Sequence, residues 1–401
     1  MDHPILSQIA LSYCPVIDRS RSVIATRLTV FPLNPSASLD PQALLEALAQ
    51  AWPIDGPKLW LNVANEGLLR DLINAQPGTH IAIEVPAFMA TDPESMAAID
   101  TLHENGNVLL LKGRPLQDLT KLILPCFNYA IVDFEDDRRI DQATGGVGIA
   151  PEGVTRHIEH VQAGICNVPD METSFRRGAA AVLGWPIDDV IKANSKPADQ
   201  PALQVIVLLI DQLHRQADIE DLENTLKRDP PLAYKLMRYI NSPAFGLSVE
   251  ISSFRHAIMI LGYQRLKRWL ALLLATASKD PNMRPVMYAA VRRGLLMEEI
   301  ARISGDEEMR NELFICGVFS LLDRMFQQPF SELLKTIPVP ERVYQALAEN
   351  TGPYEPYFAL IKAIEGGSLY DIKESAETMM TSLGDVNTAL IKALASATQL
   401  E

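Results

Sequence analysis

Hydrophobic and polar positions follow two different rhythms along the chain. Up to about residue 190, short apolar runs bounded by Gly, Pro, Asn or Asp predict strands, and these runs occupy residues 23–31, 59–64, 81–85, 108–112 and 129–133. Apolar residues at helical spacing separate them, at 41–51, 67–75, 92–104 and 116–124. Strands that alternate with helices indicate a parallel sheet built from βα units, either a β/α barrel or an open doubly wound sheet.

The second half is helical almost throughout. Residues 194–201 are polar and contain two prolines, which is typical of a linker. Beyond them, about ten segments place apolar residues at helical spacing. We therefore predict a multidomain chain with an α/β domain at 1–190, a linker at 191–201 and an all-α bundle at 202–401.

The charge of the chain is unevenly distributed. The net charge is −14, and residues 1–190 carry 13 Lys and Arg against 24 Asp and Glu. An acidic first half is a poor electrostatic match for nucleic acid or for an anionic membrane surface. The apolar runs are also too short to span a bilayer. We therefore expect no nucleic-acid partner and no membrane insertion.

The four cysteines lie far apart and form no CxxC pair, so they predict neither a zinc site nor a disulfide framework. The first residues lack the basic and apolar regions of a signal peptide. Both observations favour a cytoplasmic location.

A series of short motifs in the first half suggests a family. They are PVID at 15–18, ATRL at 25–28, LNV at 61–63, IEVP at 83–86, LLLKG at 109–113, YAIVD at 129–133 and LGW at 183–185. In this order they resemble the motifs of the EAL domain, a β/α barrel that hydrolyses cyclic di-GMP. The resemblance implies a shortened barrel, because residues 1–190 are fewer than the roughly 250 of a full β/α barrel. We expect a missing βα unit to open the barrel wall and to expose apolar surface.

Three motifs in the second half suggest another family. They are RDPPLA at 228–233, KLMRYINSPAFG at 235–246 and HAIMILG at 256–262. They resemble the HDOD domain, an all-helical relative of HD phosphohydrolases that has lost the catalytic metal site. A degenerate EAL-type barrel followed by an HDOD domain is a known bacterial arrangement.

The resemblance also allows the catalytic positions to be compared. Hydrolysis of a phosphodiester with two metal ions needs several carboxylates around both ions. The EAL signature glutamate is replaced by Thr26, a second carboxylate by Ala87, and an Asp-Asp pair by Lys112 and Gly113. The ligand positions that keep their residue types are Asn62, Glu84 and Asp133. They are either a remnant ligand site or polar barrel residues satisfied by hydrogen bonds.

The helical half shows a similar loss. Ser320 and Leu321 stand where HD hydrolases carry adjacent His and Asp ligands. On both counts the sequence predicts a protein without enzymatic activity, metal or cofactor.

Two features of the helical half are candidates for partner binding. Asn241 and Ser242 close a helix before a proline, which indicates either a recognition corner or a helix stop packed on the core. The basic residues Arg255, Arg265, Lys267 and Arg268 form either a docking patch for an acidic partner or nucleotide, or a solvated face.

The resemblance implies a bacterial signal-transduction regulator or scaffold in cyclic di-GMP pathways of motility, biofilm formation or virulence. It would act through contacts with signalling proteins, with self-association as a further option. One alternative is a receptor that binds cyclic di-GMP without cutting it, with Lys112 and Arg114 meeting phosphate. The other is a residual cyclic di-GMP phosphodiesterase.

Overall fold

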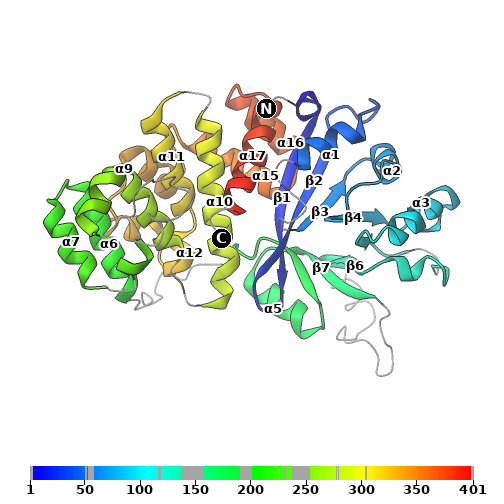
Figure 1. Ribbon diagram of the computed structural model, residues 1–401, viewed down its shortest axis with the longest axis horizontal. Coiled ribbons are helices and arrows are strands. Elements are labelled where there is room, and N and C mark those ends of the chain that lie inside the picture. The colour runs from blue at the N-terminus through cyan, green and yellow to red at the C-terminus, as the bar shows by residue number, and fades with distance from the viewer. Residues whose placement is uncertain are drawn as a thin grey trace. The chain divides into compact units, whose positions relative to one another are not determined.

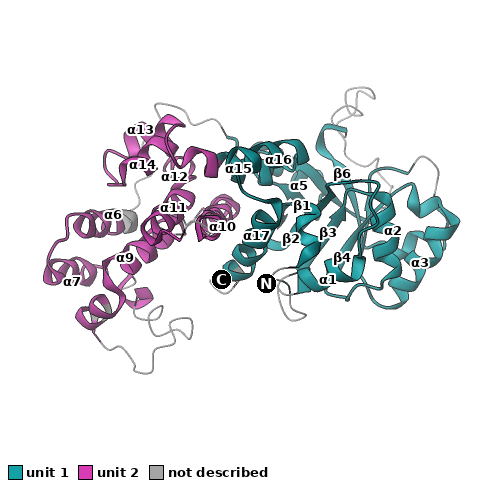
Figure 2. Cartoon of the chain, turned by 90° about the horizontal axis from the view of Figure 1, so that it is seen from above, with its two compact units in different colours: residues 1–189, 359–398 teal, residues 190–358, 399–401 magenta. Residues whose placement is uncertain are grey.

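The computed structural model describes residues 3–49, 52, 58–115, 119–136, 158–189, 201–229, 232–236, 253–276, 278, 280–302 and 305–398. The chain forms two compact units, shown in teal and magenta in Figure 2. The first unit is Met1–Asp189 with Ala359–Thr398, and the second is Val190–Phe358 with Gln399–Glu401. The predicted helical domain at 202–401 therefore differs from the structure, because its last helices belong with the barrel. Apart from Pro201, where a helix begins, the predicted linker lies outside the described residues.

Eight strands of the first unit form a closed barrel in sequence order. They are β1 Ile9–Asp18, β2 Val23–Pro32, β3 Lys58–Val63, β4 Ile81–Pro86, β5 Leu109–Lys112, β6 Tyr129–Asp133, β7 Glu159–Ile165 and β8 Ala181–Gly184 (Figure 1). β1 pairs antiparallel with both β2 and β8, and the other pairs are parallel. The expectation of an open barrel wall is therefore wrong, whereas the five strands predicted from apolar runs are confirmed.

The barrel interior is filled by apolar side chains from all eight strands. Its core residues are Val16, Ala25, Trp60, Ala82, Leu110, Ile131, Val161, Ala181 and Leu183. Successive side chains of a strand point to opposite faces, so residues two positions beyond a core residue also face the interior. This alternation determines which polar side chains reach the mouth of the barrel.

Helices α1 Pro41–Ala49, α2 Glu66–Asn74, α3 Pro93–Glu104 and α5 Val168–Arg176 follow strands of this unit. Each begins at a capping side chain, as when Asp92 accepts a hydrogen bond of 3.1 Å from the Ser95 amide. The predicted helix at 116–124 is wrong over its described part. Residues 119–123 form no helix and lead into a short 3-10 helix at Leu124–Cys126, since Pro125 disfavours α-helical backbone at the residue before it.

The end of the chain packs on the barrel through α16 Leu369–Thr378 and α17 Leu383–Thr398, with α15 Glu355–Gly366 before them. The buried side chain of Asn387 on α17 accepts a hydrogen bond from the Leu11 amide at 3.1 Å. It also donates to the carbonyls of Leu6 and Ile9, at 2.7 and 2.8 Å. These three bonds attach α17 to β1 and to the short 3-10 helix Pro4–Ser7 that precedes it.

The second unit is helical in all its described elements. They are α6 Pro201–His214, α7 Ile219–Lys227, α9 Phe254–Ala275, a 3-10 helix at Pro281–Met283, α10 Arg284–Ala301, α11 Glu307–Phe319, α12 Leu322–Phe326, α13 Phe330–Leu333, α14 Glu341–Tyr344 and a π-helical turn at Gln345–Glu349. Helix α9 is kinked at Gly262, where φ is +70°. Helices α10 and α11 cross closely at two glycines, because a Cβ on Gly317 would lie 2.6 Å from the Gly294 nitrogen.

Within the part of the chain that the structure describes, we find no helix with the length and apolar character needed to cross a membrane.

Candidate functional site

A cavity of about 670 Å³ opens at the mouth of the barrel. It lies at the carboxyl ends of the parallel strands, the end at which β/α barrels carry their active sites. Residues of β1, β2, β3, β5, β7 and β8 line it, together with the loops after β7 and β8 and the end of α15. Its polar and aromatic lining residues include Ser12, Cys14, Arg27, Thr29, Asn62, Lys112, Cys166, Trp185, Asp188, Lys362 and Glu365.

Arg27, which lines this cavity, forms a buried ion pair with Glu84. Arg27 of β2 donates from Nε to Glu84 Oε1 at 2.5 Å and from Nη2 to Glu84 Oε2 at 2.7 Å. The Glu84 side chain is fully buried, and that of Arg27 is 19% exposed. Bidentate geometry of this kind is among the strongest arrangements available to a guanidinium and a carboxylate. Glu84 is therefore occupied by an internal cation.

A second chain of contacts runs beside the ion pair. Lys112 Nζ donates to Asn62 Oδ1 at 2.8 Å, and Asn62 Nδ2 donates to Thr29 Oγ1 at 3.1 Å. The structure thus brings together three residues that the sequence singled out, Asn62, Glu84 and Lys112. It adds Arg27 and Thr29, which the sequence comparison missed.

The register of β2 explains why Arg27 was missed. The motif comparison placed the signature position at Thr26, but Arg27 and Thr29 line the cavity, and Ala25 belongs to the interior core. Thr26 lies between these positions, so its side chain points to the other face of the strand. The cavity-facing residue of this motif is therefore Arg27, a cation, and a shift of one residue reverses the side-chain direction.

The surroundings shift the pKa values of these groups. Burial lowers the pKa of Lys112, and the nearby Glu84 only partly offsets the effect. For Arg27, burial alone would lower the pKa, but the ion pair with Glu84 outweighs it and holds the pKa above its ordinary value. Burial also raises the pKa of the Cys14 thiol. Arg27 is therefore a permanent cation, whereas Lys112 loses its proton more readily than a lysine in water.

The other two barrel candidates do not line the cavity. Asp133 is exposed at the end of β6, where its Oδ1 accepts a hydrogen bond of 2.9 Å from the Glu135 amide. Arg114 is exposed beyond Gly113, and it does not line the cavity.

The residues present do not fit the two-metal site that an EAL-type barrel implies. A hard cation such as Mg²⁺ needs several oxygen ligands in a near-octahedral arrangement. The Glu84 carboxylate is engaged by Arg27, and the Asn62 oxygen by Lys112. Over the described ranges, no group of three or more His, Cys, Asp or Glu side chains could hold a metal ion.

The basic residues predicted in the helical unit do not form one patch. Arg255 is exposed and lies 3.9 Å from Glu223, and Arg265 is exposed on α9. Lys267 lines a small cavity of about 220 Å³, and burial lowers its pKa. Asn241 and Ser242 lie outside the described residues.

Arg268 has a structural contact instead. It forms a bidentate ion pair with Glu298 of α10, whose side chain is only 8% exposed. Its guanidinium also lies 3.8 Å from the ring centroid of Phe314. Arg310 approaches the same carboxylate at 3.4 Å. Arg268 therefore contributes to the packing of three helices.

The position that corresponds to the HD ligands is buried. Ser320 accepts a hydrogen bond of 3.1 Å from Arg293, which is itself buried, and donates to the Gly317 carbonyl at 2.7 Å. Leu321 is also buried. The Arg293 guanidinium and the Ser320 hydroxyl therefore meet at the position where HD hydrolases carry metal ligands.

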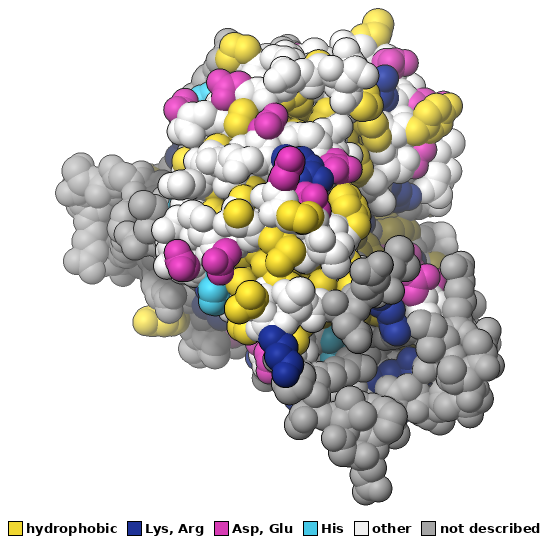
Figure 3. Space-filling view, turned by 90° about the vertical axis from the view of Figure 1, so that its right-hand side faces the viewer, with side chains coloured by type: hydrophobic (Ala, Val, Ile, Leu, Met, Phe, Trp, Pro, Cys, Tyr) yellow, Lys and Arg dark blue, Asp and Glu magenta, His cyan; other side chains and the backbone are white. Residues whose placement is uncertain are grey.

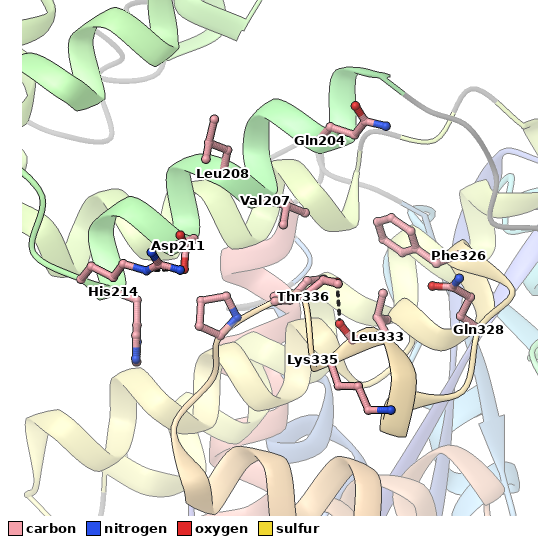
Figure 4. A pocket seen from close by; sticks show the side chains of 13 residues that line it. Gln204, Val207, Leu208, Asp211, His214, Phe326, Gln328, Leu333, Lys335 and Thr336 are labelled. Atoms are coloured by element: carbon pink, nitrogen blue, oxygen red, sulfur yellow. Dashed lines mark hydrogen bonds and ion pairs between the residues drawn. The ribbon is translucent and has the colours of Figure 1, made fainter.

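A larger cavity of the helical unit, about 790 Å³, lies between α6 and the segment around α13. Figure 4 shows Val207 of α6 on one side and Leu333 and Thr336 on the other. Two of its charged residues pair with neighbours, Arg215 with Asp211 and Lys335 with Glu332. This cavity does not bring together cationic side chains in the way that the barrel mouth does.

Apolar side chains also reach the surface of the barrel unit. Figure 3 views this unit from the side of α2 and α3 and shows apolar side chains among acidic and basic ones. Elsewhere in the unit's loops, Phe88 after β4 is 53% exposed and Leu122 after β5 is 83% exposed. Exposed apolar side chains of this kind can contribute to contact surfaces, and self-association stays a prediction.

Comparisons with known proteins extend over both halves. Residues 201–329 match the HDOD domain family. The cyclic di-GMP phosphodiesterase CdgJ of Vibrio cholerae is 26% identical over 342 residues, which cover 84% of this chain and 77% of CdgJ. The uncharacterized protein YuxH of Bacillus subtilis is 27% identical over 164 residues, 40% of each chain.

Several solved structures align with the barrel half. The cGMP-bound EAL enzyme Bd1971 covers 46% of this chain and 62% of its own, with 12% identity and a TM-score of 0.35. The phosphodiesterase PaMucR, in complex with c-di-GMP, covers 45% and 91%, with 17% identity and the same TM-score of 0.35. At these TM-scores the alignments add nothing to the barrel assignment, which rests on the strand order.

The relation to CdgJ corrects one prediction. We expected a protein without enzymatic activity, and a relative that aligns with 84% of this chain is named a phosphodiesterase. The name of this relative therefore contradicts the prediction that the chain is not an enzyme. The replaced motif residues do not establish inactivity.

The chain thus joins an eight-stranded closed barrel to helices that include an HDOD domain at residues 201–329, and its relatives CdgJ and YuxH agree with the EAL–HDOD fusion that the sequence resembles.

Proposed function

We propose that this chain is a cyclic di-GMP signalling protein whose barrel mouth binds the dinucleotide, with Lys112 and Arg27 facing its phosphate. The observation that carries the proposal is the pair of cationic side chains, Arg27 and Lys112, that line a 670 Å³ cavity. Cavities of this size accommodate small organic ligands. The name of CdgJ supports cyclic di-GMP as the ligand.

The electrostatics of the cluster favour a phosphodiester. Arg27 and Lys112 carry two positive charges against the single carboxylate of Glu84, so this part of the cavity has an excess of positive charge. The ion pair uses Nε and Nη2 of Arg27, and the same guanidinium also has a side-chain hydrogen bond with Cys14. Charge-assisted hydrogen bonds to phosphate are stronger in a partly buried site than in water.

The HDOD domain is proposed to transmit the signal by binding protein partners. The exposed residues Arg255 and Arg265 are the candidates that remain from the predicted basic patch. Both residues lie on α9, and an acidic partner would match their charge.

A second candidate function is hydrolysis of cyclic di-GMP, favoured by the name of CdgJ. For Glu84 to act on the ligand or on water, it would have to exchange its contacts with Arg27. Hydrolysis therefore predicts that the Arg27–Glu84 pair opens when the ligand binds.

Calorimetry of the full chain with cyclic di-GMP, with Mg²⁺ and with a chelator, tests the proposal. We expect a dissociation constant in the micromolar range or below, and at least tenfold weaker binding for Lys112→Ala. Lys121→Ala is the matched control, because Lys121 is exposed in the same β5–β6 connection. Lack of binding by the unmodified chain, or equal affinities for the two lysine variants, would overturn the assignment.

Chromatography of the same mixtures measures hydrolysis separately. A linear dinucleotide product that disappears in Glu84→Gln would establish the second function. Binding without product would leave binding as the function of the barrel.

A further inference from the structure

The end of the chain contributes to the cavity at the barrel mouth. Lys362 and Glu365, which lie three residues apart on α15, line it together with Gly366 and Gly367. This stretch follows the HDOD domain in the sequence, yet it belongs to the barrel unit. The ligand cavity is therefore built from both ends of the barrel unit's chain.

The position of this segment is fixed by β1. A Cβ on Gly367 would lie 3.3 Å from Ser12 Oγ, and φ at Gly367 is +70°. A left-handed backbone with so little space favours glycine at this point. Further along, Asn387 joins α17 to β1 and to Leu6 just before β1 through its three buried hydrogen bonds. These contacts hold the end of α15 at the β1 side of the cavity.

The strand order places the end of α15, which meets β1 where Gly367 lies against Ser12, on the opposite side of the mouth from β5. β5, which carries Lys112, is four strands from β1 in either direction around the closed barrel. Lys112 therefore lines the cavity from the β5 side, and Lys362 lines it from the helix that ends at the β1 side. Cyclic di-GMP carries two phosphodiester groups on opposite sides of its ring.

We propose that Lys362 contacts the second phosphate of the cyclic dinucleotide, opposite the phosphate that faces Lys112 and Arg27. The inference rests on the proposed function and adds a ligand-contacting residue from the segment after the HDOD domain. It also makes the site selective for a ligand with two phosphodiester groups over a ligand with one.

Calorimetry with two ligands tests this inference in the full chain. Lys362→Glu should weaken cyclic di-GMP binding by about tenfold, since reversing a rim charge replaces an attraction with a repulsion. It should change the binding of linear GpG, which has one phosphodiester, by less than about threefold. Lys362→Arg should bind like the unmodified chain. Because Lys362 is exposed, these substitutions should leave the fold intact, which circular dichroism checks.

The control is Lys373→Glu, which makes the same charge change at an exposed position of α16 outside the cavity. If Lys362→Glu binds cyclic di-GMP as tightly as this control, or loses affinity for both ligands equally, the inference is wrong. The proposed function would still stand if Lys112→Ala weakens binding. If the unmodified chain binds neither ligand, the proposed function itself fails.

Discussion

Arg27 and Glu84 form a two-pronged ion pair inside the barrel, at 2.5 and 2.7 Å, where an EAL-type barrel would be expected to present carboxylates to metal ions. Because the Glu84 side chain is fully buried, Arg27 rather than water surrounds its carboxylate. The pair is therefore a structural element of the barrel, and its arginine also lines the cavity.

Removing one partner of this pair should destabilise the barrel strongly. Glu84→Ala leaves the Arg27 guanidinium with no carboxylate in a largely buried site, and we expect a loss of about 3 kcal/mol in the free energy of unfolding. Denaturant titration followed by tryptophan fluorescence measures the change. The double variant Arg27→Met with Glu84→Leu should recover most of the loss, because no buried charge then remains. Equal stability of Glu84→Ala and the unmodified chain would show that the pair contributes little.

Ligand affinity should fall at alkaline pH because of Lys112. Burial holds its pKa below the ordinary 10.5, so the folded chain loses this proton at a pH where an unfolded chain keeps it. As the pH rises through that interval, the phosphate loses a cationic partner, whereas the barrel becomes more stable because the unfolded state then binds more protons.

Calorimetry between neutral pH and pH 10 measures this dependence. Lys112→Arg should show a flatter profile, since a guanidinium stays charged over the whole range. Titration of the ligand is common to both proteins, so the difference between their profiles reports on Lys112. Parallel profiles would mean that Lys112 does not face the ligand.

The attachment of the last helix should depend on Asn387. Asn387→Ala leaves one amide and two carbonyls of buried residues without this partner, which predicts a loss of about 3 kcal/mol. Asn387→Asp should not restore stability, because a carboxylate cannot donate to the two carbonyls. Hydrogen exchange of the Leu11 amide and proteolysis within α17 are the measurements. Unchanged protection in both variants would contradict this role.

Charge reversal should lower the stability of the helical unit at one arginine of α9 and leave it nearly unchanged at another. Arg268→Glu places a carboxylate against buried Glu298 and should destabilise the helical unit by about 3 kcal/mol or more. Arg265→Glu makes the same charge change at an exposed position one turn away, and we expect an effect within about 0.5 kcal/mol. Thermal unfolding of the two variants compares them directly. A similar melting temperature for both would contradict the packing role of Arg268.

The pattern of apolar residues predicted much of the barrel, and the strands that it did not predict were missed for physical reasons. Apolar runs bounded by breakers located five strands, but β7 was not among them because it places the polar residues His160 and Gln162 in buried positions. Such a strand lacks the apolar run on which the prediction depends. A resemblance to family motifs supplied parts of β1 and β8.

The candidate site was predicted in part. Motif comparison selected Asn62, Glu84 and Lys112, which lie together at the barrel mouth. It missed Arg27 because a slip of one residue in a strand exchanges its two faces. It also missed Lys362 and Asn387, because helical spacing identifies a helix without showing which unit the helix packs against.

The most direct test of the account is the affinity of the full chain for cyclic di-GMP in the presence of a metal chelator, measured by calorimetry for the unmodified protein and for Lys112→Ala. If Arg27 and Lys112 meet the phosphate, binding should persist in the chelator at micromolar or lower dissociation constant and weaken at least tenfold in the variant. Absence of binding in the chelator, or binding that Lys112→Ala leaves unchanged, would contradict it.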